Sequence, residues 1–171
     1  MSRLKPLTVP DSQAARVELA VFDFDGVFTD NTVYVNDKGE EMVRFWRGDG
    51  LGLIRLKETG VRPWVISTEL NPVVAKRCQK LKISYRQGLA KKEKALVQIA
   101  EKLKIAIQEV AYVGNDINDI ECLRLVGVPI VVADAGAEVK KVARYQTRRS
   151  GGQGAVREVC DWIVRSKEND K

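Results

Sequence analysis

The chain has 171 residues, of which 44% are hydrophobic and 30% are charged, and its 29 basic and 23 acidic residues leave a net charge of +6. This length suits one compact domain with a sizeable core and is short for two. The chain contains no histidine, which excludes histidine-dependent catalytic triads, histidine-ligated zinc sites and an imidazole general base.

The cysteines and the N-terminal segment indicate the compartment. Cys78, Cys122 and Cys160 are widely spaced, show no zinc-ribbon pattern, and are predicted to be buried free thiols. Residues 1–17 lack the apolar stretch of a signal peptide, and no apolar run has the length of a membrane helix. We therefore expect a cytoplasmic protein with no membrane partner.

From residue 17 onward, short runs rich in β-branched and aromatic residues alternate with longer segments of helical periodicity. This alternation is typical of βαβ units with a mainly parallel sheet. We predict an α/β fold, a Rossmann-like three-layer sandwich, in one domain over 17–166, between a flexible arm (1–16) and a tail (167–171). Strands are predicted at 19–22, 64–66, 83–85, 110–113, 130–132 and 145–147, and helices at 51–59, 72–81, 92–103, 120–126 and 155–165, with a short helix between the last two strands.

A β-hairpin interrupts this alternation directly after the first strand. Residues 32–35 and 42–45 flank the turn Asn36-Asp37-Lys38-Gly39, a sequence typical of hairpins. The hairpin is too small for a second domain, and we expect it to stand over the end of the sheet as a flap. Ligands of open α/β sheets bind beyond the carboxyl ends of the strands, so the polar residues that follow each strand are the candidate site.

Two aspartates, Asp23 and Asp25, follow the first strand in the segment DFDGVFTD. Two carboxylates at one strand end repel each other unless a cation or a shared proton offsets them. Oxygen ligands in a chain without histidine favour Mg²⁺, and Gly26 lets the backbone approach a ligand closely. Taken alone, a pair of turn-forming acids is an equally good explanation.

Further polar groups follow the next strands. Ser67 and Thr68 can hydrogen-bond a phosphate oxygen, Lys92 can neutralise a phosphate charge, and the turn 114–119 (GNDIND) supplies acids and amides. Taken singly, these residues also suit helix caps and a solvated surface. Together, carboxylates, a hydroxyl, a lysine and more carboxylates can bind a metal, hold a phosphate and offer a carboxylate nucleophile.

This order of motifs resembles the haloacid dehalogenase superfamily of phosphohydrolases over about residues 17–165. The likeness is greatest to a capless, tetrameric branch that includes 3-deoxy-octulosonate 8-phosphate and nonulosonate 9-phosphate phosphatases. It also extends to the C-terminal domain of acylneuraminate cytidylyltransferases. The resemblance implies a HAD-like fold and Mg²⁺-dependent hydrolysis of a phosphomonoester. The supporting segments are the hairpin, DGLG (49–52), VADA (132–135) and GGQGAVRE (151–158).

The resemblance also implies a role for each matched catalytic residue. Asp23 would attack phosphorus and become an aspartyl-phosphate. Asp25 would protonate the leaving sugar oxygen and then activate water, while Ser67 and Lys92 would hold the phosphoryl group. These roles agree with the chemistry, because charge neutralisation and in-line positioning are most of what phosphoryl transfer requires of a protein.

The metal site is where the sequence departs from the family pattern. The resemblance places Mg²⁺ between Asp23, the main-chain carbonyl of Asp25 and the turn at Asn115 and Asp116. An acid usually follows the glycine of the fourth motif, and here that residue is Asn115. An amide oxygen can ligate Mg²⁺ but brings no charge. A weaker metal site, offset by Asp116 or Asp119, and reduced activity therefore stay open.

The position after Ser67-Thr68 bears on the substrate. In the octulosonate branch it usually holds arginine, which suits a sugar carboxylate. Here it is Glu69, with Lys80 eleven residues on, which is similar to phosphatases of nine-carbon 2-keto-3-deoxy sugar acids. Glu69 would repel a carboxylate unless Lys80, from a neighbouring subunit of a homotetramer with intersubunit active sites, offsets it. Thr68 and Arg157 complete the expected substrate-binding set, and solvated surface positions are the alternative for Glu69 and Lys80.

The sequence thus predicts a Mg²⁺-dependent phosphatase of an acidic sugar phosphate, a nine-carbon 9-phosphate, with the eight-carbon 8-phosphate as the alternative. The chain lacks a basic motif interleaved with aromatic residues, so no nucleic-acid partner is expected. A non-catalytic or weakly active oligomerisation module is a rival that Asn115 keeps open. A phospho-acceptor signalling domain is set aside, because its acceptor aspartate should follow a middle strand, where this chain has Ser67.

Overall fold

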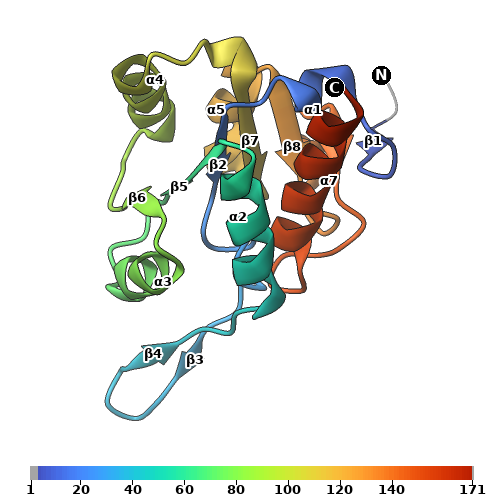
Figure 1. Cartoon of the computed structure of the whole chain (residues 1–171). Coiled ribbons are helices and arrows are strands. Elements are labelled where there is room, and N and C mark those ends of the chain that lie inside the picture. The colour runs from blue at the N-terminus through green and yellow to red at the C-terminus, as the bar shows by residue number, and fades with distance from the viewer. Residues whose placement is uncertain (1–3, 171) are drawn as a thin grey trace.

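The computed structural model describes residues 4–170. One seven-stranded sheet has the order β1-β9-β8-β7-β2-β5-β6, with every neighbouring pair parallel. From the central strand β2, the chain first adds β5 and β6 on one side and then β7, β8 and β9 on the other (Figure 1). The strands are β1 (Lys5–Pro6), β2 (Leu19–Phe22), β5 (Arg62–Ile66), β6 (Ser84–Arg86), β7 (Val110–Gly114), β8 (Val128–Val131) and β9 (Tyr145–Gln146).

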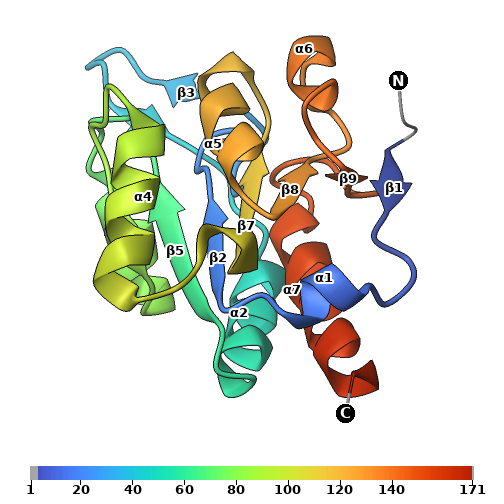
Figure 2. The ribbon, with the colours of Figure 1, turned by 90° about the horizontal axis from the view of Figure 1, so that it is seen from above.

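Helices cover both faces of this sheet (Figure 2). On one face α2 packs against α7 and α7 against α1, and on the other α4 packs against α5. The predicted α/β sandwich with a mainly parallel sheet is confirmed. The helices are α1 (Ser12–Ala15), α2 (Gly48–Glu58), α3 (Val73–Leu81), α4 (Lys92–Leu103), α5 (Ile120–Leu125), α6 (Ala137–Lys140) and α7 (Ala155–Asn169), with 3-10 turns η1 (Ile107–Glu109) and η2 (Ile117–Asp119).

The central strands carry the core. Every residue of β2 (LAVF) and β7 (VAYVG) is buried, which explains why their sequences are unbroken apolar runs rather than alternating ones. The amphipathic helix α4 contributes Leu96, Ile99 and Ala100 to the same core. The three cysteines are free and buried, as predicted.

The N-terminal segment differs from the flexible arm that the sequence predicts. Lys5 and Pro6 pair with β9 as an edge strand, and Leu7 is buried. Helix α1 packs on α7, and the indole N–H of Trp162 donates to the carbonyl of Val9 at 2.8 Å. Local sequence periodicity carries no trace of these contacts, because their partners lie some 150 residues away. Residues 1–3 lie outside the described part of the chain, and the predicted tail continues α7 to Asn169.

The hairpin projects away from the carboxyl end of the sheet (Figure 1). Its strands, β3 (Tyr34–Val35) and β4 (Glu41–Met42), pair antiparallel and are shorter than predicted. Its apolar side chains are between 51% and 63% exposed: Val33, Tyr34, Val35 and Met42.

Among residues 4–170, no helix combines the length and the hydrophobicity that a membrane-spanning segment needs.

Candidate active site

A pocket of about 340 Å³ lies at the carboxyl ends of the central strands. Its floor comes from the residues directly after β2, its walls from the turns after β5 and β7, and one side from the base of the hairpin. A crevice opens here because the chain extends the sheet from β2 first toward β6 and then in the opposite direction, toward β9. The lining residues are Asp23, Asp25, Asn31, Thr32, Val33, Glu41, Val43, Thr68, Glu69, Asn71, Val73, Asn115, Asp116, Ile117 and Asn118.

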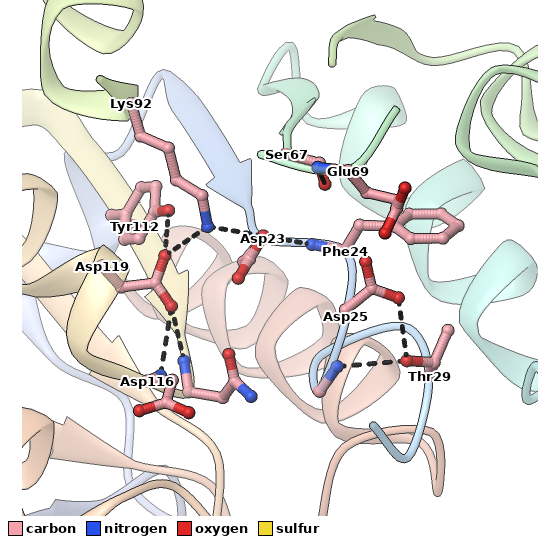
Figure 3. Close-up of polar contacts among 12 residues, drawn as sticks. Asp23, Phe24, Asp25, Thr29, Ser67, Glu69, Lys92, Tyr112, Asp116 and Asp119 are labelled. Atoms are coloured by element: carbon pink, nitrogen blue, oxygen red, sulfur yellow. Dashed lines mark hydrogen bonds and ion pairs between the residues drawn. The ribbon is translucent and has the colours of Figure 1, made fainter. Parts of the chain in front are cut away.

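A buried lysine between two buried carboxylates forms the centre of the site (Figure 3). The ammonium of Lys92, at the start of α4, lies 2.7 Å from Oδ1 of Asp23 and 2.9 Å from Oδ1 of Asp119. All three residues are at most 2% exposed. An ion pair this deep is stable only if its remaining polar atoms are satisfied. The Oδ1 of Asp23 accordingly also accepts the main-chain N–H of Phe24 at 2.7 Å.

The turn that precedes Asp119 donates hydrogen bonds to its carboxylate. Its Oδ2 accepts the main-chain N–H of Asn115 at 2.8 Å and that of Asp116 at 3.3 Å. Asp116 and Asp119 form a reciprocal capping box at the start of η2. Gly114 permits this arrangement, since a Cβ there would meet the Asp119 carboxylate at about 2.5 Å.

The charges of the site are unevenly balanced. Burial, joined by the charge of Asp119, raises the pKa of Asp23 to about 7 although Lys92 opposes the shift. Burial lowers the pKa of Lys92, but its ion pairs with Asp23 and Asp119 outweigh burial and leave the pKa raised. Lys92 therefore stays charged, and a further cation at the Asp23 carboxylate would favour its ionised form.

Asp25 points into the pocket from the loop that follows β2 (Figure 3). Burial and the charge of Glu69 raise the pKa of Asp25, so its carboxyl group holds a proton more readily than an exposed aspartate. The Oγ1 of Thr29 accepts the N–H of Gly26 at 3.1 Å and fixes the loop. Gly26 has φ 79°, and a Cβ there would overlap the side chain of Asn115.

The turn after β5 presents Ser67, Thr68 and Glu69. Ser67 is buried, and its Oγ accepts the N–H of Glu69 at 2.9 Å, which leaves the hydroxyl proton free to donate. Thr68 and Glu69 line the pocket. The Oε1 of Glu69 also accepts the N–H groups of Leu70 and Asn71, at 2.6 and 2.7 Å.

Two predicted substrate residues lie elsewhere. Lys80 sits in the last turn of α3 and does not line the pocket. Arg157 lies in the first turn of α7, where its Nε donates to Oδ2 of Asp161 at 2.6 Å. Within one copy of the chain, the fold does not bring either residue to the site.

Comparisons with known proteins agree with this geometry. Residues 81–165 match the family model for haloacid dehalogenase-like hydrolases. The chain is 37% identical over 154 residues to the 3-deoxy-D-manno-octulosonate 8-phosphate phosphatase of Escherichia coli K12, covering 90% of this chain and 82% of the relative. The chain belongs to the haloacid dehalogenase-like hydrolases.

Solved structures of this family superpose closely on the fold. A HAD family hydrolase from Streptomyces avermitilis shares 44% identity with a TM-score of 0.87, over 95% of this chain and 91% of that one. The 3-deoxy-D-manno-octulosonate 8-phosphate phosphatase of Moraxella catarrhalis, solved with magnesium, phosphate and the sugar acid, shares 35% identity with a TM-score of 0.88, over 92% and 91%. The predicted haloacid dehalogenase-type phosphatase is confirmed.

For a HAD-like hydrolase, the oxygen donors present fit Mg²⁺. Asp23, Asn115 and Asp116 line one pocket, and the single charge of Lys92 is shared between two buried carboxylates, Asp23 and Asp119. Within residues 4–170, no three His, Cys, Asp or Glu side chains converge as a metal cage. Mg²⁺ tolerates this, since it is commonly held by one or two carboxylates and keeps several waters.

Sequence reasoning missed two parts of this HAD-like site. The sequence suggests Asp119 only as a substitute metal ligand, whereas in the fold it holds Lys92 and the turn at Asn115 and Asp116. The spacing of Asp116 and Asp119 is the capping-box signal that points to this role. Glu41 of the hairpin lines the pocket, and its Oε2 accepts from Nδ2 of Asn71 at 2.9 Å. No local signal marks Glu41, because the hairpin reaches the pocket only in three dimensions.

Proposed function

We propose that this phosphatase hydrolyses the phosphomonoester of a 2-keto-3-deoxy sugar acid, through an aspartyl-phosphate at Asp23 and with Mg²⁺ as its cofactor. The 2.7 Å ion pair between Asp23, which lines the pocket, and Lys92, which is buried behind it, carries this proposal. It places a nucleophilic carboxylate beside a fixed positive charge, the two elements that phosphoryl transfer needs at one point. Bound Mg²⁺ supplies further charge neutralisation, held by Asp23, the Asp25 carbonyl, Asn115 and Asp116.

Two steps complete the reaction. A carboxylate oxygen of Asp23 attacks phosphorus, the bond from phosphorus to the sugar oxygen breaks, and Asp25 donates its proton to that oxygen. Water then attacks the phosphorus of the aspartyl-phosphate, Asp25 accepts the proton, and phosphate leaves Asp23. The raised pKa of Asp25 suits the first of these roles. Ser67 and Lys92 hold the phosphoryl oxygens throughout.

The pocket supports a site completed by a second copy of the chain. Among residues 4–170, the ionisable residues that line it are all acidic, including Glu41 and Glu69, and no lysine or arginine is part of the lining. A substrate carboxylate therefore needs a cation from elsewhere. Lys80 of a neighbouring subunit can supply it, and the exposed apolar residues of the hairpin offer a surface for assembly. We propose a homotetramer with intersubunit sites, located in the cytoplasm.

Two substrate lengths have separate support. Glu69 lines the pocket where the octulosonate branch usually has arginine, and this favours a nine-carbon 9-phosphate. The relatives named for the eight-carbon 8-phosphate favour that substrate as the second candidate. The difference is physical, because a glutamate and an arginine at one position prefer opposite charges on the distal part of the sugar.

The test is phosphate release, with Mg²⁺ in excess, from an N-acylneuraminate 9-phosphate, a deaminated nononate 9-phosphate and 3-deoxy-octulosonate 8-phosphate. We expect the largest kcat/KM for a nine-carbon substrate. A preference for the eight-carbon sugar would retain the mechanism and discard the argument from Glu69. No turnover of any of them by a folded oligomer would overturn the proposed function and favour a non-catalytic oligomerisation module, for which Asn115 is the motivating residue.

A further inference from the structure

Asp119 accepts four hydrogen bonds from three parts of the fold (Figure 3). Its Oδ1 accepts from the ammonium of Lys92 at 2.9 Å and from the hydroxyl of Tyr112 at 2.6 Å. Its Oδ2 accepts from the main-chain N–H groups of Asn115 and Asp116. One fully buried carboxylate thus sets the position of the proposed metal-binding turn and of the lysine together.

Tyr112 reaches this carboxylate from within the sheet. It lies in the middle of β7, its side chain is fully buried, and its hydroxyl points at Asp119 (Figure 3). Burial and the neighbouring carboxylates Asp119 and Asp23 hold the pKa of Tyr112 well above its usual range, so the hydroxyl keeps its proton and donates it. A phenylalanine would keep the aromatic ring in the core and remove only the hydroxyl, so this substitution isolates the hydrogen bond to Asp119.

The Lys92 ammonium has a second carboxylate partner besides Asp119. Two of its three N–H donors serve Asp23 and Asp119, which leaves one for the phosphoryl oxygen that the proposed function assigns to Lys92. Oδ1 of Asp119 also accepts the short bond from Tyr112, and an acceptor that serves two donors holds each of them less strongly than it would hold one. Tyr112 therefore weakens the pull of Asp119 on Lys92.

We propose that Tyr112 is a positioning residue, whose hydroxyl limits the hold of Asp119 on Lys92 and keeps the ammonium directed at Asp23 and the phosphoryl group transferred to it. The inference rests on the proposed role of Lys92 in holding that group. Without the hydroxyl, the ammonium moves toward Asp119 and away from phosphorus. The loss is largest where the phosphoryl oxygens carry the most charge toward the lysine, in the five-coordinate arrangement of the transition state.

The test compares Tyr112→Phe with Tyr145→Phe, which removes the hydroxyl of another buried tyrosine, in strand β9. Calorimetry measures the affinity of each protein for orthovanadate, which mimics five-coordinate phosphorus, and for inorganic phosphate, both in excess Mg²⁺. For Tyr112→Phe we expect orthovanadate affinity to fall about tenfold, the worth of one hydrogen bond to a charged group, and phosphate affinity to fall about threefold or less. Tyr145→Phe should change neither.

A rescue experiment separates positioning from packing. Tyr112→4-aminophenylalanine keeps an N–H donor at the same place and should recover most of the lost orthovanadate affinity. If Tyr112→Phe does not fold, this variant carries the comparison, with an expected affinity slightly below that of the unmodified protein. Equal losses for orthovanadate and phosphate, or identical behaviour of Tyr112→Phe and Tyr145→Phe, would overturn the inference. Failure of the unmodified protein to hydrolyse p-nitrophenyl phosphate or the sugar phosphates while still binding orthovanadate would instead count against the proposed function.

Discussion

The main-chain N–H of Arg157 donates to Oδ1 of Asp49 across 3.0 Å, so a carboxylate in the first turn of α2 holds the first turn of α7. Asp49 is 1% exposed, and its Oδ2 has no hydrogen-bond partner among the described residues. This contact joins the two long helices on one face of the sheet. It also buries a carboxylate of which only one oxygen accepts a hydrogen bond, so ionising this group in the folded protein costs free energy.

Stability should fall with rising pH on account of Asp49. Burial raises the pKa of Asp49 from 3.8 to about 6, against the opposing hydrogen bond from Arg157. Because the folded chain holds this proton more tightly than the unfolded chain, the contribution is fully present below pH 3.8 and lost as pH rises through about 6, about 3 kcal/mol in all. Urea unfolding checks this at pH 4 and pH 7.5. Between these two values, the unfolding free energy of Asp49→Asn should rise by about 2 kcal/mol relative to that of the unmodified protein.

Asp30→Asn is the control, with the opposite sign. A hydrogen bond from the hydroxyl of Thr32 lowers the pKa of Asp30, so the stability it contributes is present above its unfolded pKa and lost as pH falls. The two variants should therefore respond to pH in opposite directions. Parallel pH profiles for Asp49→Asn and the unmodified protein would remove Asp49 as the cause.

Asp23→Asn should abolish turnover and leave the protein folded. The amide cannot act as the nucleophile, and kcat should fall at least about a thousandfold. Lys92 retains Asp119 as an ion-pair partner, so the buried ammonium is not left alone. Phosphate release and thermal unfolding measure the two effects. Asp37→Asn, at the exposed tip of the hairpin, is the control and should keep full activity; substantial turnover by Asp23→Asn would remove Asp23 as nucleophile.

Asn115→Asp should preserve or tighten the dependence on Mg²⁺. The side chain of Asn115 lines the pocket beside Gly26, where we propose that the metal binds, and a carboxylate there adds the charge that the amide lacks. We expect the Mg²⁺ concentration for half-maximal activity to stay equal or fall by up to about tenfold. Asn118→Asp adds the same charge to the same pocket wall away from the proposed ligands. Loss of Mg²⁺ binding by Asn115→Asp alone would contradict the ligand assignment.

Glu69→Arg should move selectivity toward the eight-carbon substrate. The change reverses the charge that faces the distal part of the sugar, and we expect the ratio of kcat/KM for the eight-carbon over the nine-carbon substrate to rise at least about tenfold. Glu69→Gln is the matched control, because its amide oxygen can still accept from Leu70 and Asn71 while the charge is gone. A ratio unchanged by Glu69→Arg would show that this position does not select the sugar.

Much of the fold can be predicted from the sequence, because the patterns that indicate its helices and strands are local. Helix α4 has the predicted bounds, Lys92–Leu103, since its apolar residues recur with the helical period. Strand β2 also has its predicted bounds, and β7 extends the predicted run by one residue, since both are unbroken apolar runs. Parallel strands end at one edge of a sheet, and this rule alone predicted that Asp23, Ser67 and the 114–119 turn would meet.

Local sequence patterns cannot predict contacts between distant segments. The edge strand at Lys5–Pro6 and the anchoring of Val9 by Trp162 depend on residues about 150 positions apart. For the same reason, only the fold shows that Lys80 and Arg157 lie away from the pocket of their own chain while Glu41 lines it.

The amino-acid order determined which chemical groups this protein can use, because strand ends and helix starts follow from local periodicity and place Asp23, Asp25, Ser67 and Lys92 at one edge. Only the tertiary structure decided how those groups are held. Asp119 takes its role from Lys92 and Tyr112, which lie 27 and 7 residues away in the chain and within hydrogen-bond distance in space. A buried charge is governed by the partners that packing supplies, and packing is a property of the whole fold.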